Sequence, residues 1–227
     1  MDEGTSLFLS RIAALADPAL TAATRLEGWT RRHLVAHVAG NAEALNRLVH
    51  WALTGEPTAM YATPEQRGDD IATGAQLPPN ALRSWLRSSA SDLSRHLDRL
   101  SDDAWAHPVV TAQGRTVAAT EIPWLRAREV MVHAVDLDAG VTFGDLPRAF
   151  VAALIADVVA KRSGVRDGPA LVVTATDLDD QWIVAGNGDR LEISGRLADL
   201  AAWLTGRAQP GLRTSGGAGL PTLPPWL

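Results

Sequence analysis

A glutamate and a histidine four residues apart, Glu129 and His133, are the first candidates for chemistry in this 227-residue sequence. On a helix, residues four apart lie one turn from each other on one face, so both side chains can reach the same ion. Their neighbours Val130, Val132 and Val135 are apolar, which indicates that this helix is well packed. The same spacing also occurs in ordinary surface pairs, so the motif alone is weak evidence for a metal site.

A third ligand could come from His37, a polar residue inside the apolar run 34–39. Helical bundles commonly build metal sites from inward-facing His and Glu side chains on facing helices. Two histidines and one carboxylate leave a coordination position open, as a catalytic zinc requires, and the same set could hold Fe(II). His33 lies four residues before His37 and competes for this role. A buried histidine with one hydrogen bond is the alternative interpretation.

Composition restricts the kinds of chemistry and partner. The chain has no cysteine, which excludes disulfides, Cys-rich zinc sites and a protein thiol nucleophile, so any thiol chemistry needs a small-molecule thiol. The net charge of -5 argues against nucleic acid as a partner. No apolar run approaches the roughly 18 residues of a membrane helix, and the acidic start lacks a signal-peptide pattern. We therefore expect a cytoplasmic protein without a membrane span.

The elements that must position these residues can be predicted from periodicity and capping signals. Thr30 is a suitable N-cap, and Gly55 follows the expected end of the helix that carries His37. The long segment 58–76, which contains Arg67, is predicted to be a loop, and loops of this length are often functional. The remaining expectations for this part are helices at 6–15, 30–53, from 78 onward and at 120–138, with a β-excursion at 105–117.

The hydrophobic periodicity changes after Gly144, from a pattern typical of long helices to one typical of alternating helices and short strands. The sequence predicts a helix at 147–161, strands at 170–175, 181–184 and 190–193, a turn at 186–189 and a last helix at 196–204. The fold class is therefore α+β. We expect a four-helix bundle over residues 1–143, followed by a small α/β domain over residues 144–227.

Several segments, taken together in order and spacing, resemble a known family. They are Leu26–Thr30, His33–Val38, His50–Glu56, Pro64–Arg67, Leu125–Leu137 and Trp203–Arg207. The chain resembles the mycothiol-dependent maleylpyruvate isomerases over nearly its whole length, including the Pro-Pro-Trp-Leu ending. The resemblance implies a DinB-like metal-binding helical bundle fused to a small α/β domain.

The resemblance also implies roles for individual residues. The zinc ligands of the family fall on His37, Glu129 and His133, and its functionally important arginines fall on Arg67 and Arg207. The resemblance therefore favours His37 over His33 as the third metal ligand. Without the resemblance, Arg67 would be interpreted as a solvated loop residue and Arg207 as a favourable charge at a helix C-terminus.

The activity implied by the resemblance is the cis–trans isomerisation of maleylpyruvate to fumarylpyruvate in gentisate catabolism, with zinc and mycothiol as cofactors. A thiolate can add to the activated alkene, the new single bond can rotate, and the thiolate can leave. Zinc lowers the pKa of a bound thiol without redox chemistry. Arg67 and Arg207 could bind the two carboxylates of the substrate, hold the thiol or stabilise an enolate.

Two other functions are compatible with the sequence. A mycothiol S-transferase that conjugates electrophiles would use the same metal ligands but would consume its thiol. A non-catalytic ligand-binding module is the alternative from another class, because the C-terminal domain is somewhat similar to a sterol carrier-type fold.

Overall fold

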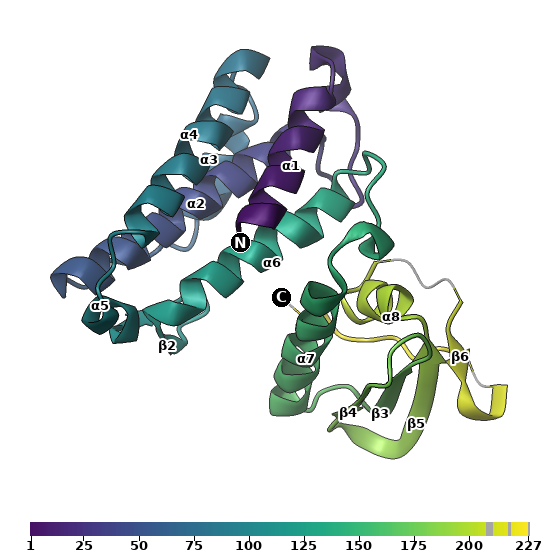
Figure 1. The fold of residues 1–227 in the computed structure, drawn as a ribbon. Coiled ribbons are helices and arrows are strands. Elements are labelled where there is room, and N and C mark those ends of the chain that lie inside the picture. Colours follow the sequence, from purple (N-terminus) through teal and green to yellow (C-terminus); the bar gives the residue numbers. More distant parts are fainter. Residues whose placement is uncertain (208–210, 218, 227) are drawn as a thin grey trace. The chain divides into compact units, whose positions relative to one another are not determined.

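Figure 1 shows the chain as a computed structural model, which describes residues 1–207, 211–217 and 219–226. Two compact units are present, Met1–Gly140 and Val141–Leu227. The helices of the first unit are α1 (Asp2–Ala14), α2 (Arg31–Thr54), α3 (Gln66–Gly74), α4 (Pro79–Leu97), α5 (Asp102–Ala106) and α6 (Ile122–Asp136). Its strands are β1 (Pro108–Val110) and β2 (Thr116–Ala118), and 3-10 turns occupy Asp17–Thr21 and Ala119–Glu121.

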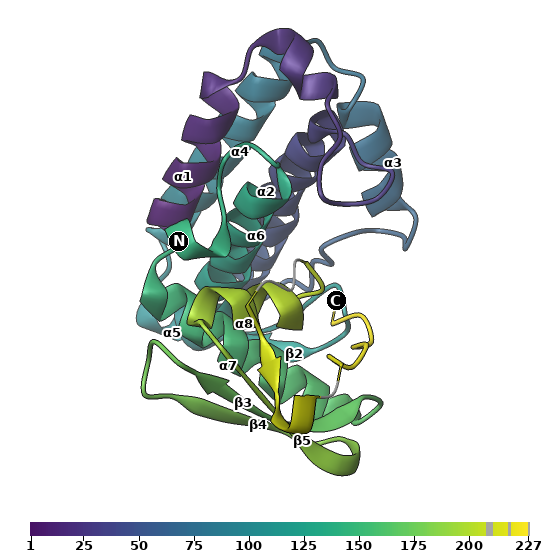
Figure 2. The ribbon, with the colours of Figure 1, turned by 90° about the vertical axis from the view of Figure 1, so that its right-hand side faces the viewer.

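Helix α2 is the centre of the first unit, where α1, α2, α4 and α6 form the predicted bundle (Figure 1 and Figure 2). It contacts α3, α4 and α6, while α1 contacts α4 and α6. Leu34, Leu45 and Leu48 of α2 are fully buried, and each contributes about 1.5–3 kcal/mol through burial. Because α2 is covered from several directions, polar residues on it can also be held in the interior.

The ends of α2 follow the local signals in the sequence. Thr30 is the N-cap and forms a capping box with His33, whose Nδ1 lies 2.7 Å from the Thr30 hydroxyl. Gly55 ends the helix with a φ of 74°, a left-handed conformation that glycine adopts without steric cost. His33 is therefore part of the helix start, and His37 lies one turn further into the bundle.

Arg67 lies on helix α3 and not in a loop, so the prediction of one long loop is wrong in this part. Only Ile71 and Gly74 of α3 are buried, and so short an apolar face gives no recognisable helical stripe. A Cβ atom at Gly74 would come within 2.5 Å of the Trp85 ring and 2.9 Å of the Ala36 side chain. The absence of a side chain at this glycine lets α3 lie directly on α2 and α4.

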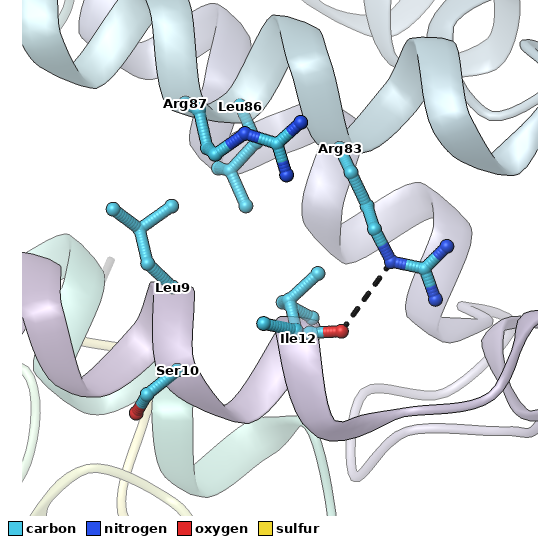
Figure 3. Close-up of a pocket in the computed structure, with 7 residues that line it drawn as sticks. Leu9, Ser10, Ile12, Arg83, Leu86 and Arg87 are labelled. Atoms are coloured by element: carbon cyan, nitrogen blue, oxygen red, sulfur yellow. Dashed lines mark hydrogen bonds between the residues drawn. The ribbon is translucent and has the colours of Figure 1, made fainter.

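Helix α4 is joined to α1 by one arginine (Figure 3). The Arg83 Nε donates to the Ile12 carbonyl oxygen at 3.5 Å, and its Nη2 donates to the Leu15 carbonyl oxygen at 2.7 Å. Beside this contact, Leu9, Ile12 and Leu86 line a pocket between the two helices. None of the described residues that line it is acidic or a histidine, so this pocket offers no metal ligands.

The second unit is a small α/β unit. Its helices are α7 (Arg148–Val165) and α8 (Leu197–Leu204), and its strands are β3 (Pro169–Ala175), β4 (Gln181–Val184), β5 (Asn187–Gly195) and β6 (Arg213–Thr214). Short 3-10 turns lie at Phe143–Asp145 and Ser215–Gly217. The sheet order is β4-β3-β5-β6, with β3 and β5 parallel and the other pairs antiparallel. Helix α7 contacts β4 and α8, and α8 contacts β3 and β5.

The predicted α+β class, with a helical first part and an α/β second part, is confirmed. Apart from the unpredicted helix α3 and strand β6, the differences lie mainly at element ends. Helix α1 begins four residues earlier than predicted, Trp105 belongs to α5 and not to the hairpin, and the predicted turn at 186–189 lies largely within β5. The β5 difference arises because β3 lies between β4 and β5, so the chain after residue 186 pairs with β3 from Asn187 onward and forms no hairpin with β4. Among the described residues, no helix combines the length and apolar character of a membrane span.

Candidate metal centre

His37, Glu129 and His133 meet in the interior of the first unit. Each offers one ligand atom, and these atoms all lie within 4.8 Å of one another. Nε2 of His37, on α2, lies 3.0 Å from Oε2 of Glu129, on α6. The same carboxylate oxygen lies 3.3 Å from Nε2 of His133, one turn further along α6. The two imidazole rings meet edge to face with centroids 4.9 Å apart.

The three side chains are held in a largely dry environment. His37 is 4% exposed, and the side chains of His133 and Glu129 are 14% and 18% exposed. The ring of Trp29 contacts His37 edge to face, with centroids 5.6 Å apart. A cluster of two imidazoles and one carboxylate with limited solvent access suits a divalent cation such as zinc.

Asp136 supports His133 from the side opposite to Glu129. Its carboxylate is completely buried, and Oδ2 lies 2.9 Å from Nδ1 of His133. A proton on Nδ1 donates to Asp136 and leaves Nε2 directed toward the cluster, the arrangement that commonly orients metal-bound histidines. Sequence reasoning missed Asp136, although an acid three residues after a candidate ligand on the same helix was the available signal.

Hydrogen bonds, charge and burial shift the pKa values of Glu129, His133 and His37 in different directions. Burial raises the pKa of Glu129, but the hydrogen bonds from His133 and His37 outweigh it and hold that pKa well below its usual range. Burial lowers the pKa of His133, but the hydrogen bonds to Asp136 and Glu129 outweigh it and raise the pKa overall. For His37, burial dominates and lowers the pKa. Without a metal, the carboxylate is ionised and the proton is held preferentially on His133.

Arg126 ties α6 to α2 beside the cluster. Its guanidinium is 1% exposed and donates from Nη1 to the Val38 carbonyl oxygen at 2.7 Å and to Asn41 Oδ1 at 2.9 Å. Burial lowers the pKa of Arg126 to about 10, and the charge of Glu129 opposes this shift. Val38 follows His37 directly, so Arg126 connects the backbone next to one candidate ligand with the helix that carries the other two. No sequence pattern pointed to this residue.

The two predicted arginines belong to different units. Arg67 is exposed on α3, and its Nη2 lies 3.5 Å from Nδ1 of His37, so it reaches the edge of the cluster. Arg207 follows α8 in the second unit. Its backbone N–H donates to the Ala202 carbonyl oxygen at 2.8 Å, and its Nη1 donates to the Thr205 carbonyl oxygen. The first unit therefore brings together four of the five predicted site residues.

Two family models match the chain. One is described as the mycothiol maleylpyruvate isomerase N-terminal domain and matches residues 2–138. The other is described as the MDMPI C-terminal domain and matches residues 145–225. No curated protein matches the chain.

Two solved structures are similar to the whole chain. One is a crystal structure of the mycothiol-dependent maleylpyruvate isomerase, with 41% sequence identity and a TM-score of 0.94 over 99% of this chain and 93% of that chain. The other, a mutant of that isomerase with alanine in place of a histidine, has the same identity, coverage and TM-score.

Proposed function

Because the chain belongs to the mycothiol maleylpyruvate isomerase family, we propose that it converts maleylpyruvate to fumarylpyruvate with the help of a low-molecular-weight thiol, mycothiol. The observation that carries this proposal is the meeting of His37, Glu129 and His133 in a chain that has no cysteine. A metal-activated external thiol supplies the nucleophile that the protein itself lacks.

We propose that the three residues bind a divalent metal ion, and that the ion is zinc. The donor set supports this, since two neutral imidazoles and an ionised carboxylate fit zinc and leave a position free for another ligand. When bound, zinc lowers the pKa of a coordinated thiol and so favours the thiolate at neutral pH. Asp136 orients His133, and Arg126 fixes the segment next to His37.

The reaction then needs no net change in the thiol. The thiolate sulfur adds to one alkene carbon, forming a C–S bond, and the π electrons move to the conjugated carbonyl oxygen as an enolate. Rotation about the resulting C–C single bond exchanges the cis and trans arrangements. When the enolate collapses, the C–S bond breaks, the double bond reforms in the trans geometry and the thiolate is released.

We propose that Arg67 and Arg207 bind the carboxylates of this dianionic substrate, and that Arg67 also stabilises the enolate. The chain has a net charge of -5, so binding a dianion requires local cations, and guanidinium groups bind carboxylates in a bidentate manner. The position of Arg67 beside His37 supports its role near the reacting atoms. The division into domains at residues 143 and 144, the sterol carrier-type likeness and the cytoplasmic location remain predictions.

The test follows the absorbance of maleylpyruvate with purified protein, with and without mycothiol, and includes the variant His37→Ala. The matched control is His50→Ala, since His50 is an exposed residue on the same helix. The bound metal is identified and counted by elemental analysis of each protein. We expect thiol-dependent isomerisation and one zinc per chain for the wild type and the control, and loss of both for His37→Ala.

Other outcomes lead to different conclusions. Stoichiometric metal without isomerisation contradicts the proposed substrate. Consumption of mycothiol in step with an added electrophile then identifies the S-transferase alternative. Isomerisation that proceeds equally well without a thiol contradicts the thiolate mechanism.

A further inference from the structure

Two arginines of α2 hold the chain on either side of α3. In the segment before α3, the Met60 carbonyl oxygen accepts a hydrogen bond from Nη1 of Arg47 at 2.6 Å. In the turn that follows α3, the Ala75 carbonyl oxygen accepts from Nε of Arg32 at 2.5 Å, and the Leu77 carbonyl oxygen accepts from Nη2 of the same side chain. In the described part of the chain, neither guanidinium group pairs with a carboxylate, so both are used on the backbone around α3.

Helix α3 is too short to hold its own position firmly. It spans nine residues, whereas isolated helices shorter than about 12–15 residues are marginal in water. Its buried residues are Ile71 and Gly74, of which only Ile71 has a side chain to bury. Hydrogen bonds from a charged donor are stronger than those between neutral groups. The bonds from Arg32 and Arg47 can therefore determine where α3 lies against α2.

The position of α3 matters for the candidate site because this helix carries Arg67. Nη2 of Arg67 lies 3.5 Å from Nδ1 of His37, the ring nitrogen that does not face Glu129. His37 lies on α2 between Arg32 and Arg47. The helix that carries this candidate ligand therefore also holds α3 on both sides of Arg67. A displacement of about 1 Å in a group that binds substrate can reduce the rate about 100-fold.

The two arginines differ in how well lysine could replace them. Arg32 uses two nitrogens on two carbonyl oxygens, and the single ammonium group of lysine lacks this planar fork. Arg47 uses one nitrogen on one carbonyl oxygen, a bond that an ammonium group can also make. We therefore expect lysine to preserve the position of α3 at residue 47 but not at residue 32.

We propose that Arg32 and Arg47 are positioning residues, which fix α3 against α2 and thereby place Arg67 for the carboxylate of the substrate. The inference rests on the proposed function, because it takes Arg67 as a group that binds the substrate. Neither positioning arginine has to touch the substrate, since both donate to backbone oxygens. Their replacement should then reduce activity only while Arg67 is present.

A double-mutant cycle tests this dependence. The kcat and KM for maleylpyruvate are measured for Arg32→Ala and Arg47→Ala, each alone and combined with Arg67→Ala, and for Arg32→Lys and Arg47→Lys. The lysine variants keep the charge and serve where an alanine variant does not fold. The matched control is Arg31→Ala. Arg31 precedes Arg32 on α2 and also donates to backbone oxygens, but these belong to Leu137 and Asp138, which follow α6.

We expect Arg32→Ala and Arg47→Ala to lower kcat/KM at least about tenfold when Arg67 is present, because a bond from a charged donor is lost. In the Arg67→Ala background the same changes should cost less than about twofold, whereas any effect of Arg31→Ala should be equal in both backgrounds. Arg47→Lys should resemble the wild type, and Arg32→Lys should not. Equal losses with and without Arg67, in proteins that keep their zinc, overturn the proposal.

Hydrogen exchange of the zinc-loaded proteins provides a measurement that needs no substrate. The backbone amides of α3 should exchange at least about tenfold faster in Arg32→Ala and Arg47→Ala, while those of α4 stay unchanged. Arg31→Ala should leave α3 as it is in the wild type. Unchanged exchange of α3 in both variants overturns the proposal. A wild-type protein that does not isomerise maleylpyruvate refutes the proposed function instead, and the exchange rates still decide whether the two arginines hold α3.

Discussion

The carboxylate of Asp136 lies 2.9 Å from Nδ1 of His133 and is completely buried, so the imidazole is held between Asp136 on one side and Glu129 on the other. This relationship sets which nitrogen of His133 faces the candidate metal centre. It also places two carboxylates around one histidine, which makes His133 the strongest proton acceptor of the cluster when no metal is bound.

Replacing Asp136 by asparagine should weaken metal binding about 10–100-fold, because the amide no longer fixes the His133 tautomer or strengthens the ligand. Competition titration with a zinc chelator measures the change. Asp138→Asn is the control, since Asp138 is an exposed residue two positions further whose carboxylate pairs with Arg25. Equal zinc affinity of the two variants would contradict the orienting role of Asp136.

Metal binding should depend on pH through His133. Its pKa is raised in the folded, metal-free protein, so protonation stabilises that form below the ordinary histidine pKa of about 6.5, and this stabilisation is lost as the pH rises through the raised value. A metal ion must displace the proton. The apparent zinc affinity should therefore rise about tenfold per pH unit below the raised pKa and level off above it.

Calorimetric titration in buffers of different ionisation enthalpy checks this directly, because binding should release close to one proton per zinc on the acidic side. In Glu129→Gln the carboxylate that helps to raise the pKa of His133 is gone, so NMR of the metal-free variant should show that pKa shifted downward. An affinity that does not change with pH contradicts the assignment of the proton to His133.

Arg126→Met should destabilise the fold by about 2–4 kcal/mol, because the Val38 carbonyl and the Asn41 amide oxygen lose their donor in the interior. The free energy of unfolding of the metal-free protein in urea measures this effect. Arg99→Met, at an exposed arginine, should change it by less than about 0.5 kcal/mol. A stability of Arg126→Met equal to that of the control would show that these bonds contribute little.

Arg67→Lys should reduce kcat/KM for maleylpyruvate about tenfold or more, since lysine retains the charge but not the planar fork that pairs with a carboxylate. Zinc content should not change, because Arg67 contacts only the far nitrogen of His37. Arg87→Lys is the matched control, since Arg87 is an exposed arginine of α4 that lines the pocket facing α1 (Figure 3). Full activity of Arg67→Lys would remove this arginine from the substrate site.

Local sequence signals were sufficient for much of the helical framework. The capping residue Thr30 and the glycine at position 55 determine the ends of α2, since both act through contacts within a few residues. Helix α3 could not be predicted in the same way. Its stability comes from Ile71 and the close approach of Gly74 to other helices, and such contacts are not visible in a local window.

What the sequence by itself determined was that Glu129 and His133 share one helical face, because they are four residues apart on a helix. It also determined that any thiol chemistry would require an external thiol, because the chain contains no cysteine. Only the tertiary structure decided that His37, 92 residues away from Glu129, faces that pair, that Asp136 and Arg126 hold the arrangement, and that Arg67 reaches its edge. The physical reason is that these relationships depend on how α2, α3 and α6 pack together, and packing is set by the contacts of the whole bundle.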